Sequence, residues 1–260
     1  MKAYAFGAED APTLLLLPGT CCHWQGNFGR VIPLLEKDFR VLCVSYDGFD
    51  ETENTTFPMM TEETEKIEAY IQTQCGGHIR AAYGCSLGGA CLTRLLALGQ
   101  IPVGRAVIDA GITPYRMPLP LRRLALLRDR LGFRLVTKNR KVLEAAYPPQ
   151  RWTLPGRDPA EEYDALAAYL KTYSARTVRN IFWSANNYAL PPAPAKTGCS
   201  LAYWYGEEKK KARRHNIRFI TGYFLHAGLC GIPQMDHAEL VMIHPQEFYR
   251  YTKRFLDPEG

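Results

Sequence analysis

Short, continuous apolar runs alternate with longer stretches of helical periodicity along most of this chain. The apolar runs are too short for helices and read as strands buried on both faces. These runs are residues 13–17, 40–45, 79–83, 106–108, 201–205 and 228–233. Between them, Ile67 and Ile71 lie four residues apart, and Leu92, Leu95 and Leu96 also fall at helical spacing. The alternation predicts an α/β fold with a mostly parallel central sheet and helices on both faces.

Residues 112–197 interrupt this rhythm. Pro114, Pro118 and Pro120 open the segment, two or three amphipathic helical stretches follow, and Pro191-Pro192-Ala193-Pro194 closes it. We therefore expect a helical cap at 112–197, inserted between two strands of a core that consists of residues 1–111 and 198–260.

Composition fits one such α/β core with an inserted subdomain. The chain has 260 residues, of which 47% are hydrophobic and 22% charged. The first residues lack the apolar core of a signal peptide, and the run at 14–17 is too short to span a bilayer. We expect a soluble, cytoplasmic protein with no membrane span, in which the eight scattered cysteines are mainly buried, reduced thiols.

The net charge of +6 originates in one segment. Residues 112–197 hold 15 Lys and Arg against 6 Asp and Glu, whereas the remainder holds 17 against 20. The favoured interpretation is a solvated helical exterior, and the alternative is a field that attracts anionic substrates or acidic partners. The side chains expected to point to water are Arg122, Arg123, Arg128, Arg130, Arg134 and Lys138. No nucleic-acid motif accompanies them, so no nucleic-acid partner is expected.

The pentapeptide Gly84-Cys85-Ser86-Leu87-Gly88 lies between an expected strand and an expected helix. A sharp turn from strand to helix strains the backbone of the serine, and neighbours without side chains let the two limbs pass closely. Such pentapeptides are also found in ordinary turns. The position at a strand–helix junction favours Ser86 as a nucleophile.

A serine hydroxyl needs a base, and the base needs an acid to hold its tautomer. In strand-turn-helix hydrolases the histidine follows the last strand and precedes the last helix. Of six histidines, His237 meets this requirement, since it lies between the expected strand at 228–233 and a helix at 245–255. His215 belongs to the basic stretch around 209–214, which reads as a solvated helix face, and His23 is expected only to pack near an early loop.

Two carboxylates compete for the role of the acid. Glu208 follows the run at 201–205 and is the first choice, whereas Asp109 ends the strand after the serine helix and is the alternative. Glu207, or no acid at all, is also left open. The structural interpretation makes Asp109 a turn residue before a glycine and places Glu208 in a helix N-terminal turn favoured by the macrodipole.

An oxyanion requires two backbone donors. The N–H of Leu87 follows the nucleophile at the start of a helix, and the loop after the run at 13–17 supplies the second donor, for which we expect Thr20, or else Cys21. The alternative for this loop is a plain Pro-Gly turn.

In this order the motifs resemble the α/β-hydrolase superfamily over nearly the whole chain. Residues 14–24 resemble its oxyanion segment, 84–88 its nucleophile elbow, 205–208 its acid position, and 236–248 its histidine loop and final helix. Two positions depart from the usual pattern: Pro18-Gly19 stands where many members have His-Gly, and Lys209 stands where many have the acid.

The resemblance implies a serine hydrolase that cleaves a small or medium carboxylic ester through an acyl-enzyme. No metal or organic cofactor is expected, because the sequence has no H-E-x-x-H motif, no P-loop and no clustered set of His and Asp ligands. Peptidase, thioesterase or acyltransferase activity on the same residues is the alternative. A non-catalytic ligand-binding protein on the same scaffold is the rival from another class.

Overall fold

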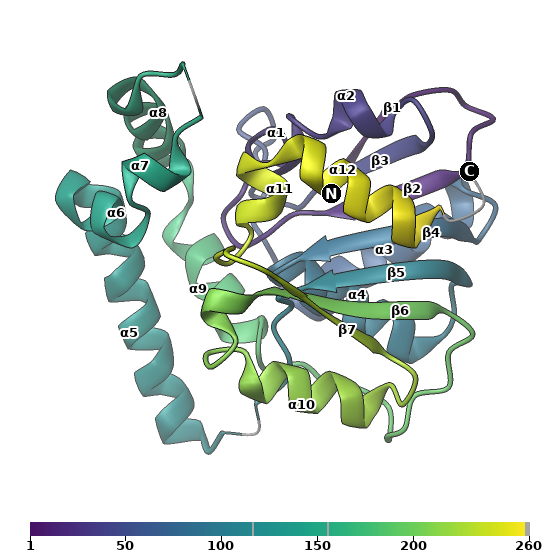
Figure 1. The fold of residues 1–260 in the computed structure, drawn as a ribbon. Coiled ribbons are helices and arrows are strands. Elements are labelled where there is room, and N and C mark those ends of the chain that lie inside the picture. Colours follow the sequence, from purple (N-terminus) through teal and green to yellow (C-terminus); the bar gives the residue numbers. More distant parts are fainter. Residues whose placement is uncertain (116, 155, 258–260) are drawn as a thin grey trace.

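A mostly parallel sheet of seven strands forms the centre of the protein (Figure 1). The computed structural model describes residues 1–115, 117–154 and 156–257. The strands follow one another across the sheet in the order β1-β3-β2-β4-β5-β6-β7. Their bounds are β1 (Lys2–Phe6), β2 (Thr13–Leu17), β3 (Arg40–Ser45), β4 (Ile79–Cys85), β5 (Val103–Asp109), β6 (Ser200–Gly206) and β7 (Gly228–Ile232). The predicted α/β class and sheet type are confirmed.

Helices cover both faces of the sheet, because alternate residues of each strand point to opposite sides. Leu15 and Leu17 of β2 belong to one apolar core, whereas Leu14 and Leu16 belong to the other. The first core is closed by α3 (Met60–Gln74), α4 (Leu87–Leu98) and α10 (Arg214–Tyr223). The second is closed by α1 (Trp24–Phe28), α2 (Ile32–Leu35), α11 (Glu239–Ile243) and α12 (Pro245–Leu256).

Strand β1 was not expected from the sequence. It pairs antiparallel with β3 alone, from Lys2 opposite Ser45 to Phe6 opposite Val41. Its side chains are half-buried or exposed, because it forms the edge of the sheet. An edge strand lacks the continuous apolar run that marks the buried strands, so its pattern carries little signal.

In the described part of the chain between β5 and β6, five helices extend beyond the carboxyl ends of the parallel strands (Figure 1). We refer to this part of the chain as the α5–α9 segment. Its helices are α5 (Leu119–Lys138), α6 (Arg140–Ala146), α7 (Pro149–Trp152), α8 (Pro159–Thr172) and α9 (Ala175–Ser184). The sequence suggested two or three helical stretches, and the short α6 and α7 account for the difference. The division into core and cap stays a prediction.

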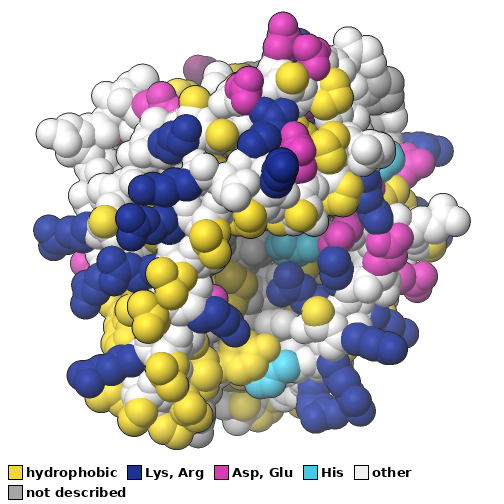
Figure 2. Space-filling model, turned by 90° about the vertical axis from the view of Figure 1, so that its left-hand side faces the viewer, with side chains coloured by type: hydrophobic (Ala, Val, Ile, Leu, Met, Phe, Trp, Pro, Cys, Tyr) yellow, Lys and Arg dark blue, Asp and Glu magenta, His cyan; other side chains and the backbone are white. Residues whose placement is uncertain are grey.

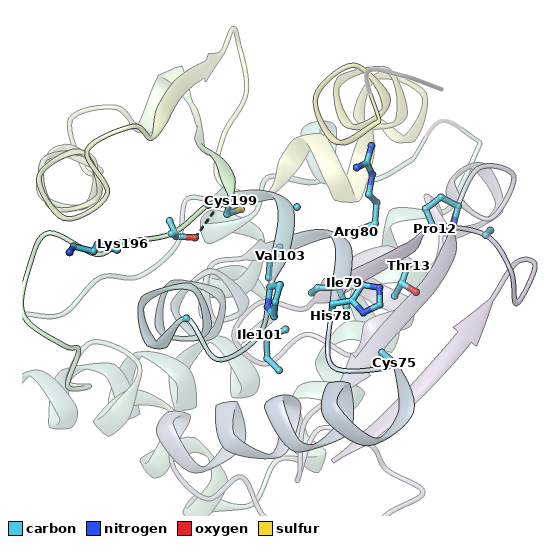
Figure 3. Close-up of a pocket in the computed structure, with 16 residues that line it drawn as sticks. Pro12, Thr13, Cys75, His78, Ile79, Arg80, Ile101, Val103, Lys196 and Cys199 are labelled. Atoms are coloured by element: carbon cyan, nitrogen blue, oxygen red, sulfur yellow. Dashed lines mark hydrogen bonds between the residues drawn. The ribbon is translucent and has the colours of Figure 1, made fainter.

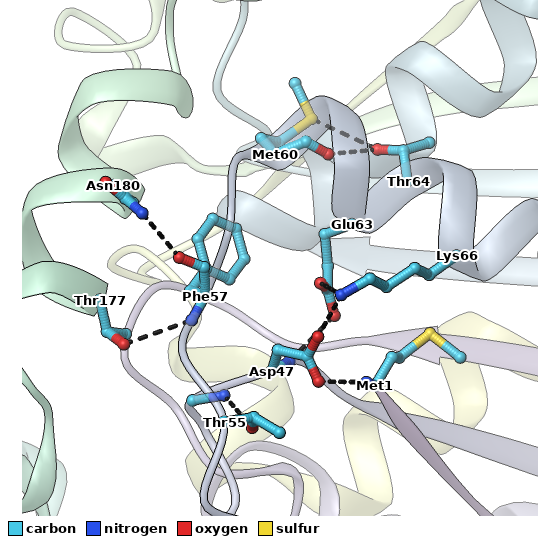
Figure 4. Close-up of polar contacts among 11 residues, drawn as sticks. Met1, Asp47, Thr55, Phe57, Met60, Glu63, Thr64, Lys66, Thr177 and Asn180 are labelled. Carbon is cyan, nitrogen blue, oxygen red and sulfur yellow. Dashed lines mark hydrogen bonds and ion pairs between the residues drawn. The ribbon is translucent and has the colours of Figure 1, made fainter.

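Helix α9 joins this segment to the chain that leads into α3 (Figure 4). The backbone of buried Phe57 donates to Thr177 Oγ1 at 3.3 Å and accepts from Asn180 Nδ2 at 2.9 Å. Met60 N donates to Ser184 Oγ at 3.0 Å. These side chains satisfy buried backbone groups before α3 and at its first residue, where an unpaired group would be costly.

Two further features concern the chain as described. None of the described helices has the length and apolarity needed to cross a bilayer. All eight cysteines are free, and Cys21, Cys43, Cys85 and Cys91 are buried.

Candidate active site

The turn between β4 and α4 holds Ser86 in a strained conformation. Ser86 has φ 51° and ψ −103°, a region that residues with a side chain rarely occupy. The glycines around it are sterically required: a Cβ on Gly84 would lie 2.5 Å from Gly88 O, and one on Gly88 would lie 2.1 Å from Leu17 O. Ser86 N donates to Asp109 O at 2.9 Å, which fixes the turn against β5. The strained strand-turn-helix predicted for the pentapeptide is therefore present.

The loop after β2 begins beside this serine. A Cβ on Gly19 would lie 3.7 Å from Ser86 Cβ, so the loop that carries Thr20 starts in contact with the turn. Leu87 is the first residue of α4, where backbone N–H groups have no acceptor within the helix. The two segments expected to supply oxyanion donors thus meet at Ser86, and the roles of Thr20 and Leu87 stay predictions.

His237 lies in the loop between β7 and α11, as expected. This loop is pressed against the end of β6, where a Cβ on Gly206 would lie 2.2 Å from Met235 O. Burial lowers the pKa of His237 to about 3, and the positive charges of Arg213 and Lys209 act in the same direction. Its Nδ1 is buried and has no hydrogen-bond partner among the described residues. The imidazole is therefore neutral at neutral pH.

The two candidate acids have different surroundings. Glu208 has a side chain that is 45% exposed, and its Oε2 accepts from Arg151 Nη1 at 2.6 Å. Asp109 is 5% exposed, pairs in register with Cys85, and accepts a hydrogen bond from the Tyr83 hydroxyl. Burial raises the pKa of Asp109 to about 6. Within the described residues, neither carboxylate is hydrogen-bonded to His237.

Arg151 of α7 ties the α5–α9 segment to the loops around His237. Besides Glu208, its guanidinium donates to Gln234 O at 2.8 Å and to Glu239 Oε2 at 2.7 Å. Glu239 Oε2 also accepts from Asp236 N at 2.7 Å, directly before the histidine. Arg151 carries no signal in the sequence, because its partners lie more than fifty positions further along the chain and no local motif connects them.

Arg213 is the second basic residue that the sequence analysis missed. Its neighbours Lys211 and Arg214 are exposed, as expected for a solvated face, but Arg213 is partly buried. Its Nε is buried without a hydrogen-bond partner among the described residues. Its charge lowers the pKa of both Asp109 and His237. An unpaired guanidinium thus acts electrostatically on two of the candidate catalytic groups.

Arg122 also departs from the expected solvated exterior. Its guanidinium lies 3.6 Å from the centre of the Trp183 ring, and Nη2 donates to Trp183 O at 3.1 Å. This cation–π contact places it on the inner side of α5. The other five basic side chains of α5 are exposed, as predicted.

A cavity of about 690 Å³ lies at the amino ends of the parallel strands, on the side of the sheet away from Ser86 (Figure 3). It is lined by Thr13, Ile79 and Val103, which begin β2, β4 and β5, whereas Ser86 follows the carboxyl end of β4. The cavity is therefore separate from the candidate site. In the part of the chain that is described, no group of three or more His, Cys, Asp and Glu side chains is arranged to hold a metal ion.

Comparison with known proteins supports the same framework. The model of the family described as alpha/beta hydrolases matches residues 14–251. A structure from Desulfitobacterium hafniense, described as an alpha/beta hydrolase family protein, is similar with a TM-score of 0.78 and 17% identity, over 98% of this chain and 100% of that one. No curated protein matches the sequence.

Two other solved structures have named activities. A 2-hydroxy-6-oxo-6-phenylhexa-2,4-dienoate hydrolase from a Rhodococcus species is similar with a TM-score of 0.72 and 18% identity, over 97% of this chain and 93% of that one. A carboxylesterase from Bacillus subtilis gives a TM-score of 0.67 and 14% identity, over 99% and 88%. At these identities the likeness concerns the fold.

Proposed function

We propose that this chain, which belongs to the alpha/beta hydrolase family, is a serine hydrolase that cleaves a small or medium carboxylic ester through an acyl-enzyme on Ser86. The observation that carries the proposal is the strained Ser86 backbone, with φ 51°, at the turn between β4 and α4. Strain of this kind is retained where the surrounding structure imposes it, and it is typical of exposed nucleophiles in this fold.

His237 is the proposed general base. Its neutral imidazole takes the proton of the Ser86 hydroxyl while Oγ forms a bond to the ester carbonyl carbon. The N–H groups of Leu87 and Thr20 donate to the resulting oxyanion. The imidazolium then gives its proton to the leaving alcohol as the carbon–oxygen bond breaks. In the second half, His237 takes a proton from water as the water oxygen attacks the acyl carbon. The imidazolium then returns this proton to Ser86 Oγ as the acyl carbon–Oγ bond breaks, which releases the carboxylic acid and restores the serine.

Asp109 is the stronger candidate for the carboxylate that supports the imidazolium. It is buried at the end of β5, in register with the residue before Ser86, and the Tyr83 hydroxyl holds it in place. Glu208 is paired with Arg151 on a more exposed side chain, which fits a role in holding α7 near the site. The buried Nδ1 of His237 has no hydrogen-bond partner among the described residues and is the atom that the acid would have to reach.

The charge of Arg213 near the candidate catalytic residues favours an anionic substrate. Its guanidinium has no hydrogen-bond partner among the described side chains, and it acts on both Asp109 and His237. A carboxylate or phosphate group on the substrate would give this charge a bidentate partner. We therefore propose that esters with an acidic substituent react faster than neutral esters of equal length.

The rival proposal is a non-catalytic protein that binds a small ligand on the same scaffold. The absence of an acid hydrogen-bonded to His237 in the described structure favours it. Turnover of p-nitrophenyl esters of increasing chain length, with and without a terminal carboxylate, separates the two proposals. We expect hydrolysis that is lost in Ser86→Ala. Equal ester turnover by the native protein and this variant would refute the serine mechanism. Faster hydrolysis of thioesters or peptides than of esters would keep Ser86 as the nucleophile but assign a thioesterase or peptidase activity.

A further inference from the structure

The outer face of α5 exposes five leucines to solvent. Leu121, Leu124 and Leu127 are 54%, 61% and 53% exposed, and Leu131 and Leu135 are 50% and 57% exposed. They account for half of the large hydrophobic side chains that are exposed in the described part of the chain. Isolated exposed leucines are ordinary on a protein surface, but five along one helix form a continuous apolar stripe.

The spacing of these leucines places them on one side of the helix. They follow one another at intervals of three, three, four and four residues, which at about 100° per residue confines them to a sector of about 120°. The opposite side of α5 carries Phe133, whose ring packs near Tyr173 and Phe182 of the rest of the segment. The leucine stripe is therefore not the face by which α5 packs on its neighbours.

Basic residues border the stripe. By the same helical geometry, Arg123, Arg130 and Arg134 lie along one side of it, and Arg128, with a 77% exposed side chain, lies within the sector of the leucines. In all, α5 contains six Lys and Arg residues and one acidic residue, Asp129, an excess of five positive charges. Figure 2 shows this face, on which hydrophobic side chains gather beside Lys and Arg side chains next to a hollow.

We propose that the outer face of α5 docks onto a phospholipid bilayer that contains anionic lipids, with the helix lying in the plane of the interface. Such a surface offers partners for both kinds of side chain. The leucines can contact the acyl chains, and the arginines can bind the negatively charged headgroups. A second copy of the chain fits less well, because two such faces would bring arginines against arginines. Docking in this orientation would turn the hollow in Figure 2 towards the lipid.

Vesicle sedimentation with the full chain tests this proposal. We expect the protein to pellet with vesicles of phosphatidylcholine and phosphatidylglycerol, less with phosphatidylcholine alone, and less in high salt. Leu124→Ser/Leu131→Ser is expected to lower the vesicle partition coefficient by about tenfold or more, since each change removes a buried apolar side chain from the interface. Leu225→Ser/Leu229→Ser is the matched control, because these leucines are 64% and 49% exposed away from α5.

The outcomes separate docking from its alternatives and from the proposed catalysis. Equal pelleting of the α5 variant and the control variant would overturn the proposal, as would no pelleting of the native chain. A native dimer in analytical ultracentrifugation that becomes monomeric in the α5 variant would assign the stripe to a second copy instead. Hydrolysis of a water-soluble ester should be unchanged in the α5 variant. The docking proposal can therefore fail while the hydrolase proposal stands, and the hydrolase proposal can fail while the docking proposal stands.

Discussion

Arg151 Nη1 lies 2.6 Å from Glu208 Oε2, so the carboxylate first expected to orient His237 is paired with a residue of α7. The ion pair joins the chain after β6 to the α5–α9 segment, and the role of Glu208 as the acid stays a prediction. Asp109, the other candidate acid, is buried at the end of β5.

The two acids can be distinguished by substitution. Asp109→Asn should lower kcat on the order of 10³-fold, because an amide cannot support the imidazolium. Glu208→Gln should change kcat less than about threefold, because it weakens only a partly exposed ion pair. Ester hydrolysis under saturating substrate gives both values. The reverse ranking would restore Glu208 as the acid, and Tyr83→Phe serves as a control for general disturbance around Asp109.

Activity should depend on pH through Asp109. Its pKa is raised to about 6 by burial, so the carboxylate is ionised above that pH and protonated below it. We therefore expect kcat/KM to fall as the pH drops through about 6. Asp109→Asn should remove this acidic limb. A limb that persists unchanged in the variant would assign the titration to another group.

Arg213 should control both substrate charge and this pH profile. Its charge lowers the pKa of Asp109, so Arg213→Gln should move the midpoint of the acidic limb to higher pH. The variant should also lose about tenfold in kcat/KM for an ester with a terminal carboxylate, with a smaller change for the neutral ester. Arg213→Lys keeps the charge and should keep the midpoint. An equal loss for both esters would speak against recognition of an anion.

Buried His237 should make the folded state sensitive to mild acid. The folded-state pKa is lowered to about 3 from 6.5, so the unfolded chain takes up a proton below about pH 6.5 that the folded chain refuses. This contribution to stability is present above the unfolded pKa and is lost as the pH falls. Between about pH 7.5 and pH 5 it should cost about 2 kcal/mol.

His237→Gln removes that contribution, so the variant should gain about 2 kcal/mol relative to the native chain on going from about pH 7.5 to pH 5. Urea unfolding at the two pH values measures the difference, and the change at Asp109 cancels because both proteins contain it. Replacement of the exposed His215 by Gln is the matched control. If the free energies of unfolding of the native protein and the variant differed by the same amount at both pH values, His237 would already be solvated in the folded state.

Much of the framework could be read from the sequence because it is encoded locally. The buried strands appear as continuous apolar runs, and the glycines around Ser86 mark a turn that admits no side chain. His237 could be found because the order of elements places it after the last strand. The edge strand β1 could not, since its half-exposed residues resemble a loop.

The charges that surround His237 and the two candidate acids could not be predicted from the sequence. Arg151 binds partners on two different segments, and Arg213 is partly buried although Lys211 and Arg214 beside it are exposed. The choice between Asp109 and Glu208 depends on such long-range contacts. The leucine stripe of α5 is visible as periodicity, but only the packing of its opposite face shows that it points outward.

Covalent labelling by a fluorophosphonate, read by intact-protein mass spectrometry, tests whether Ser86 is a nucleophile activated by His237. The native protein should gain one phosphonyl group on Ser86, Ser86→Ala should gain none, and His237→Gln should react far more slowly. Equal labelling of the native protein and Ser86→Ala, or no labelling of the native protein at all, would contradict the account.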